Sequence, residues 1–127
     1  TVTWLAVDAA LAAGGAVRAH AGFAKLDAAT CGDAYALHDG DGVRSASHAV
    51  PFPADAAFTK SPHVVTALSL VDASTDDTDV RVTADAVGVE RDKCELLLKT
   101  WSDSKTAAVG VGWLALGVGS EAARAAA

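Results

Sequence analysis

The feature that most constrains this chain is an alternation of apolar and polar residues with a period of two, running from Phe52 to about Val118. Successive side chains of a β-strand point to opposite faces, so this period predicts strands and not helices. Polar turns interrupt the alternation at residues 72–79, 88–93 and 102–105. The strands expected between them are residues 62–71, 80–89, 94–101 and 109–118.

Arg81 stands out in the second of these strands because it is charged within a run of Val and Ala. Alternate positions of this strand form an apolar face made of Val80, Val82, Ala84 and Ala86. Arg81 has the opposite parity, so we expect its side chain on the outer face. There it is either a solvated or cross-strand residue, with Asp85 and Glu95 as partners, or a ligand contact.

Two tryptophans in this half receive opposite predictions. Trp101 shares the charged face of its strand with Lys99, and an exposed Trp often marks an interface. The apolar face of the same strand is formed by Cys94, Leu96 and Leu98. Trp113 lies on the apolar face of the last strand, so we expect it in the core. Its neighbours on that face are Val109, Val111 and Ala115.

The region at residues 8–49 is Ala-rich, which favours helix, but glycines break every long run. We expect mostly loop there, with a short helical turn at residues 24–29. Residues 39–42, Asp-Gly-Asp-Gly, predict a tight turn in which Gly supplies a positive φ. The expected fold is therefore all-β, with an irregular Ala/Gly-rich N-terminal region.

One internal similarity bears on domain organisation: residues 1–7 echo residues 111–116, each with Trp followed by Leu and Ala. We expect residues 1–7 to be the last strand of a preceding repeat, against a chance likeness of two strands with a buried Trp. The remaining divisions are a loop-rich segment at 8–49, the sandwich at 50–118 and a tail at 119–127.

The net charge of −6 opposes binding to nucleic acid or to an anionic membrane surface. The ten Lys and Arg residues are scattered and form no basic stripe. The apolar stretch at residues 9–17 contains two glycines and is too short to span a bilayer. We therefore expect no nucleic-acid partner and no membrane insertion.

Neither a catalytic nor a metal site is indicated. The four His residues are dispersed without metal-ligand spacing, and no GxSxG motif places a nucleophile. The acidic loop with Asp76, Asp77 and Asp79 lacks the EF-hand pattern. We expect no enzyme activity, no metal and no cofactor. Cys31 and Cys94 are compatible with one disulfide or with two core thiols.

Residues 51–117 resemble the H-type lectin domain, which is known from snail agglutinins and discoidins. The carriers are Phe52-Pro53, Phe58 with Pro62, Val64 and Val65, then Asp79-Val80-Arg81-Val82, residues 99–105 (Lys-Thr-Trp-Ser-Asp-Ser-Lys) and residues 111–115 (Val-Gly-Trp-Leu-Ala). The resemblance implies an antiparallel six-stranded β-sandwich that assembles as a trimer. It also implies binding of galactose or N-acetylgalactosamine at clefts between protomers, outside the cell or at its surface, as in cell adhesion.

Four residues match the family's sugar contacts. Asp41 and Arg81 match the Asp and Arg that one protomer contributes, and Trp101 with Ser102 matches the neighbour's Trp and the polar residue after it. Two departures are visible: Ser102 stands where sugar-binding members often have His, and Ala107 replaces an aromatic residue. The alternative is therefore that the chain is a structural or interaction module that has lost sugar binding. Such a module would pack against copies of itself in an extracellular or cell-surface assembly.

The resemblance also implies a disulfide from Cys31, within Cys31-Gly32-Asp33, to the strand that leads into Trp101. Cys94 lies on that strand, four residues before the family's position. A bridge between Cys31 and Cys94 is expected on this ground, against two reduced buried thiols.

Overall fold

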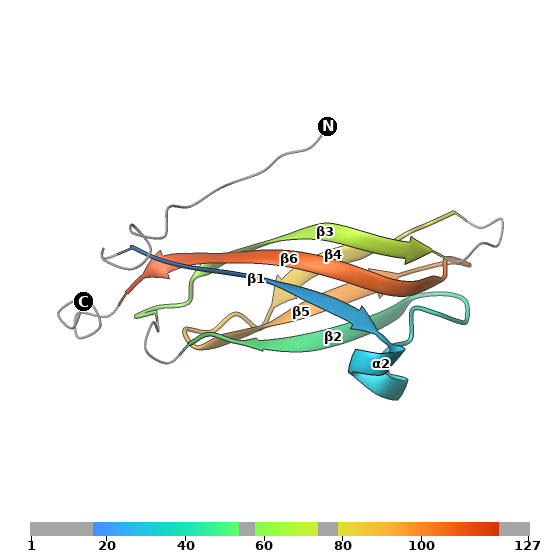
Figure 1. The fold of residues 1–127 in the computed structure, drawn as a ribbon, viewed down its shortest axis with the longest axis horizontal. Coiled ribbons are helices and arrows are strands. Elements are labelled where there is room, and N and C mark those ends of the chain that lie inside the picture. Colours follow the sequence, from blue (N-terminus) through green and yellow to red (C-terminus); the bar gives the residue numbers. More distant parts are fainter. Residues whose placement is uncertain (1–16, 54–57, 74–78, 120–127) are drawn as a thin grey trace.

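The computed structural model describes residues 17–53, 58–73 and 79–119. Within them, six strands form two antiparallel three-stranded sheets that face each other as a sandwich (Figure 1). The strands are β1 (Val17–Asp27), β2 (Arg44–Pro51), β3 (His63–Ala73), β4 (Thr83–Val87), β5 (Lys93–Thr100) and β6 (Thr106–Val118). One sheet has the order β1-β6-β3 and the other β2-β5-β4. The predicted all-β, six-stranded sandwich is confirmed.

The core lies between the two sheets and follows the predicted alternation. Cys94, Leu96 and Leu98 of β5 are at most 1% exposed, and Val109, Val111 and Ala115 of β6 are fully buried. Trp113 is partly buried and packs against this core, with its ring centroid 5.9 Å from that of Phe52. The inner faces of β5 and β6 were therefore predicted correctly.

The loop expected at residues 8–49 contains two strands, which corrects that expectation. β1 pairs with β6 along its whole length, from Val17 opposite Val118 to Asp27 opposite Ala108. Pairing with a buried neighbour overrides the weak strand propensity of an Ala-rich sequence. The short helical turn expected at residues 24–29 occurs later, as the helix α2 (Ala28–Cys31), which leads into the 3₁₀ turn η1 (Gly32–Ala34).

Gly22 shows why β1 tolerates a glycine. A Cβ atom at this position would lie 2.6 Å from Cζ2 of Trp113, closer than packed atoms come. The missing side chain therefore leaves room for the indole ring across the β1–β6 pair. A glycine that suggests a loop in the sequence is here a close approach between two strands.

The expected disulfide is not formed, and both Cys31 and Cys94 are free thiols. Cys31 ends α2, and β5 runs from Cys94 towards the end of the sandwich where α2 lies (Figure 1). Each strand residue advances about 3.3 Å, so the six steps from Cys94 to Thr100 separate it from that end by roughly 20 Å. Cys94 is buried, and the burial raises the pKa of its thiol.

Some expectations concern parts of the chain that the structure leaves undescribed. The strand expected at residues 1–7 lies outside the described residues, as do residues 120–127 of the tail. The same holds for Asp76 and Asp77 of the acidic loop, whereas Asp79 is described.

Candidate functional site

Three polar segments meet at one end of the β2-β5-β4 sheet, on the right of Figure 1. They are the loop at residues 39–43 that leads into β2, residues 79–82 that lead into β4, and the turn at residues 101–105 between β5 and β6. The backbone N–H of Gly42 donates to the carbonyl of Ser102 at 3.0 Å. The N–H of Arg81 donates to Oγ of Ser104 at 2.8 Å. These bonds join the three segments into one surface.

The predicted tight turn at residues 39–42 is present. Gly40 and Gly42 have φ values of 88° and 79°, a region that favours glycine. The Asp39 carboxylate accepts a hydrogen bond from the N–H of Gly40 at 2.8 Å. Asp41 lies between the two glycines and is exposed, so its carboxylate is available to a ligand.

Trp101 is 40% exposed directly after β5, which agrees with the charged face predicted for it. Ser102 follows with φ of 60°, the one non-glycine residue with a positive φ in the described ranges. The turn is closed by a bond from the N–H of Ser104 to the carbonyl of Trp101 at 3.4 Å. This sharp turn leaves a large aromatic side chain and a hydroxyl side by side at the surface.

The prediction for Arg81 needs correction. β4 begins at Thr83, so Arg81 precedes the strand and its parity does not fix its direction. Its guanidinium pairs neither with Asp85 nor with Glu95: it donates to Asp103 at 3.0 Å and to Asp79 at 2.9 Å. The side chain is 30% exposed. Arg81 therefore ties the segment before β4 to the turn that follows Trp101.

Arg44 also belongs to this surface, and the sequence analysis missed it. Its guanidinium donates to three backbone carbonyls, those of Asp39 at 2.7 Å, Gly42 at 3.1 Å and Ser102 at 2.8 Å. The only signal in the sequence is a lone Arg just after a glycine turn, which does not indicate its partners. The structure thus brings Asp41 and Ser102 together on linked loops.

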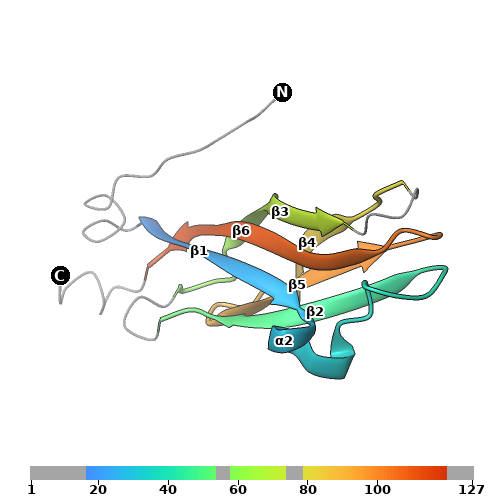
Figure 2. The same ribbon diagram turned by 45° about the vertical axis from the view of Figure 1, so that its right-hand side comes forward.

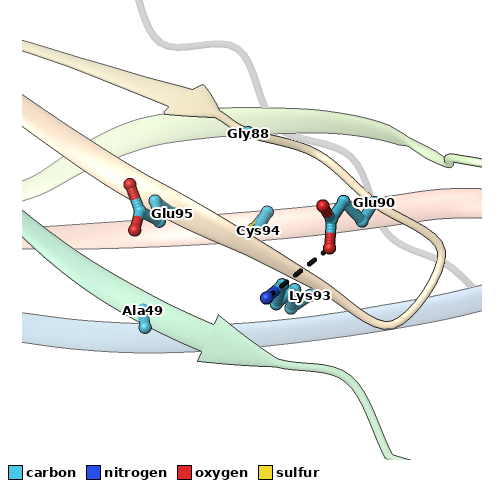
Figure 3. A pocket seen from close by; sticks show the side chains of 6 residues that line it. All are labelled: Ala49, Gly88, Glu90, Lys93, Cys94 and Glu95. Atoms are coloured by element: carbon cyan, nitrogen blue, oxygen red, sulfur yellow. Dashed lines mark ion pairs between the residues drawn. The ribbon is translucent and has the colours of Figure 1, made fainter.

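A hollow lies at the opposite end of the same sheet. It has a volume of about 310 Å³ and is lined by Ala49, Gly88, Glu90, Lys93, Cys94 and Glu95. Glu90 and Lys93 form an ion pair at 3.6 Å across the β4–β5 turn (Figure 3). The exposed ion pair and the buried thiol offer no aromatic surface to a ligand. This hollow is therefore the weaker candidate.

In the described ranges, no group of three or more His, Cys, Asp or Glu side chains is arranged to hold a metal ion. None of the helices in the described part of the chain has the length and apolar character needed to cross a membrane.

The comparisons with known proteins agree with the fold. The family model described as H-type lectin domain matches residues 47–116. A structure of recombinant discoidin II of Dictyostelium discoideum is similar, with a TM-score of 0.68, 22% identity, and coverage of 84% of this chain and 39% of that one. A structure of wild-type discoidin II from the same organism has the same TM-score and identity, and 38% of its length is covered.

The chain therefore spans about two fifths of the length of the discoidin II chains that it matches. Their identity is low, so this likeness shows the fold. A comparison with curated proteins finds no match. The family model, in contrast, covers more than half of the chain, including β3, β4, β5, most of β2 and most of β6. The chain belongs to the H-type lectin domain family.

Proposed function

We propose that this chain is a carbohydrate-binding module, without enzyme activity, that recognises galactose or N-acetylgalactosamine outside the cell or at its surface. The observation that carries the proposal is the meeting of the loop bearing Asp41, the segment bearing Arg81 and the turn bearing Trp101 and Ser102 at one end of the sheet. Family membership supports the same function.

Each of the four residues supplies a chemistry that a neutral sugar requires. The Asp41 carboxylate accepts hydrogen bonds from sugar hydroxyls, and the exposed indole of Trp101 covers the apolar face of a galactose-type ring. Ser102 adds a hydroxyl that donates and accepts. A guanidinium has five N–H donors, and the ion pairs to Asp79 and Asp103 use two of those of Arg81. Arg81 can therefore bridge its carboxylates to a sugar oxygen.

We also propose that the sugar cleft is completed by another copy of the chain, in a trimer or in tandem repeats. The β1-β6-β3 sheet turns one face away from the β2-β5-β4 sheet (Figure 2). This outer face carries exposed apolar side chains suited to such contact. Phe23 is 58% exposed, Val65 57% and Leu70 40%. A monomer seldom leaves a contiguous apolar face of this kind in water.

The second candidate is a structural or interaction module that has lost sugar binding. Two observations favour it. Both carboxylates that hold Arg81 are exposed and compete with a ligand for the guanidinium. Ala107, which is exposed, supplies no aromatic wall beside Trp101. A module of this kind keeps the apolar face for assembly and needs no free donors at the end of the sheet.

Calorimetric titration with N-acetylgalactosamine separates the two functions. We expect wild type to bind and Trp101→Ala to bind at least about tenfold more weakly, which corresponds to about 1.4 kcal/mol of lost ring contact. Arg91→Gln, an exposed position in the β4–β5 turn at the opposite end of the β2-β5-β4 sheet, is the control and should bind as wild type does. A wild-type chain that binds neither this sugar nor any glycan on an array excludes the lectin function and leaves the structural module.

A further inference from the structure

Arg44 occupies an unusual position at the candidate sugar-binding end, because one side chain holds two separate loops. Its guanidinium donates to the carbonyls of Asp39 and Gly42, which lie on either side of Asp41. Its remaining terminal nitrogen donates at 2.8 Å to the carbonyl of Ser102, 58 residues away in sequence. Three carbonyls in three directions match the planar fork of a guanidinium, and an ammonium group cannot reproduce that arrangement.

The carbonyl of Ser102 is the point where the two loops join. It accepts hydrogen bonds from the side chain of Arg44 and from the backbone N–H of Gly42. Ser102 itself has φ of 60°, a left-handed conformation that non-glycine residues adopt only when their surroundings impose it. These two donors fix the peptide group that follows the strained residue. Together with the bond from the N–H of Ser104 to the carbonyl of Trp101, they hold Ser102, and Trp101 just before it, in the observed turn.

The loop on the other side is shaped around the same side chain. Gly40 and Gly42 both have positive φ, and a Cβ atom at Gly40 would lie 3.4 Å from Cδ of Arg44. The loop thus wraps the Arg44 side chain and leaves Asp41 exposed at its tip. Arg44 itself is only partly buried, so packing alone does not explain why each of its three guanidinium nitrogens donates a hydrogen bond.

We infer that Arg44 is a positioning residue for sugar recognition: it couples the loop of Asp41 to the turn of Trp101 and Ser102 and sets their relative placement without touching the sugar. This inference rests on the proposed function for its meaning, but its structural part stands on the contacts alone. It assigns to this chain a positioning residue in addition to the four ligand contacts proposed above.

The structural part is tested by ¹⁹F NMR on the full chain labelled with 5-fluorotryptophan. The chain has three tryptophans, and Trp101→Phe and Trp113→Phe assign their resonances. Arg44→Gln and Arg44→Lys are both expected to shift and broaden the Trp101 resonance while the Trp113 resonance stays in place. Arg91→Gln is the matched control, an exposed Arg in the β4–β5 turn at the far end of the sheet. An unmoved Trp101 resonance in a folded Arg44 variant overturns the inference.

Arg44→Lys distinguishes the effect of the three hydrogen bonds to carbonyls from the effect of the positive charge alone. Lys keeps the positive charge but cannot reach three carbonyls, so we expect it to behave like Arg44→Gln. A Trp101 resonance that has the wild-type position and width in Arg44→Lys contradicts the positioning role of these three hydrogen bonds. A second measurement compares the loss of melting temperature that Arg44→Gln causes in the wild-type chain and in a Ser102→Gly chain. There glycine accepts the positive φ without strain, so we expect a smaller loss of melting temperature than in the Ser102 chain. An equal loss in both chains contradicts the inference.

The binding part is tested by titration of the same variants with N-acetylgalactosamine. We expect Arg44→Gln and Arg44→Lys to raise Kd at least about fivefold, with Arg91→Gln unchanged. Equal Kd values for wild type and folded Arg44 variants overturn the positioning role. Absence of binding by wild type is a different result, because it removes the proposed function while the ¹⁹F measurement still decides whether Arg44 holds the turn.

Discussion

Tyr35 shows at the scale of one residue how the irregular segment before β2 is fastened to the core. It is 1% exposed, and its hydroxyl donates to the carbonyl of Thr106 at 3.0 Å. The N–H of Thr106 in turn donates to the carbonyl of Leu37 at 2.9 Å. These bonds hold the chain that leads to Asp41 against the first residue of β6, so they also help to place the candidate site.

Tyr35→Phe removes this hydroxyl and leaves a buried carbonyl with fewer donors. We expect the free energy of unfolding at pH 7 to fall by about 1 kcal/mol, the usual net contribution of such a bond. Burial raises the pKa of Tyr35. The stabilisation by the protonated Tyr35 hydroxyl is therefore fully present below pH 10, its ordinary pKa, and is lost as the pH rises through the raised pKa of the folded chain. Urea denaturation at pH 7 and pH 10.5 checks both points, and equal stability of the two proteins at pH 7 contradicts them.

Gly22→Ala tests the contact between β1 and Trp113. The added methyl group would lie 2.6–2.9 Å from three atoms of the indole ring, so the ring or the strand must move. We expect a loss of about 1–3 kcal/mol in urea denaturation. Gly112→Ala is the control, because its nearest contact is Oγ of Ser69 at 3.1 Å, the end of a side chain that can turn away. If the Gly22→Ala chain is as stable as the Gly112→Ala chain, the close approach of β1 to the Trp113 ring is contradicted.

At the scale of the element, the strands in the second half were predictable and those in the first half were not. β5 and β6 alternate between aliphatic and polar residues, so their inner faces can be identified from the sequence. β1 places Arg18, His20 and Gly22 on its inward side, and none of them looks like a core residue. Its structure depends on pairing with β6, which no local pattern shows.

The helix α2 has a cap whose strength depends on pH. The Asp27 carboxylate accepts a hydrogen bond from the N–H of Thr30 at 2.9 Å, and the Thr30 hydroxyl accepts one from the N–H of Asp27. The bonds from Thr30 lower the pKa of Asp27 below its ordinary value of 3.8. The stabilisation by the ionised carboxylate is thus present above pH 3.8 and lost as the pH falls through the lowered pKa.

Asp27→Asn keeps a capping oxygen but removes the charge. We expect its melting temperature to lie below that of wild type at pH 6 and the gap to close as the pH falls below 3.8 and through the lowered pKa of Asp27. Thermal unfolding followed by circular dichroism from pH 6 to pH 2.5 measures this. A gap that stays constant over the whole range rules out the ionised cap.

At the scale of the whole molecule, the site depends on loops that meet only after folding. The tight turn of Asp41 and the exposure of Trp101 follow from local sequence, so both were predicted. Arg81 was misplaced because β4 starts two residues after it. Arg44 was missed because its partners are backbone carbonyls on two different loops, which carry no signature in the sequence.

The apolar outer face of the β1-β6-β3 sheet leads to a prediction about assembly. Phe23 and Leu70 lie over Gly110 on this face and are exposed in the single chain. We expect wild type to self-associate and Phe23→Glu to shift the molar mass measured by light scattering towards the monomer, because a buried unpaired carboxylate is costly. Ser47→Glu, an exposed residue of β2 in the other sheet, is the control. A monomeric wild type contradicts the shared cleft.

The most direct test of the sugar site is an NMR titration of the ¹⁵N-labelled chain with N-acetylgalactosamine. We expect saturable shifts in the backbone amides of residues 39–44, of Arg81 and of Ser102, and in the indole N–H of Trp101. Amides around the hollow at the β4–β5 turn should stay in place. The proposed sugar site is contradicted if saturating sugar leaves the resonances at the Trp101 end unchanged, or if it shifts only the amide resonances at the opposite end.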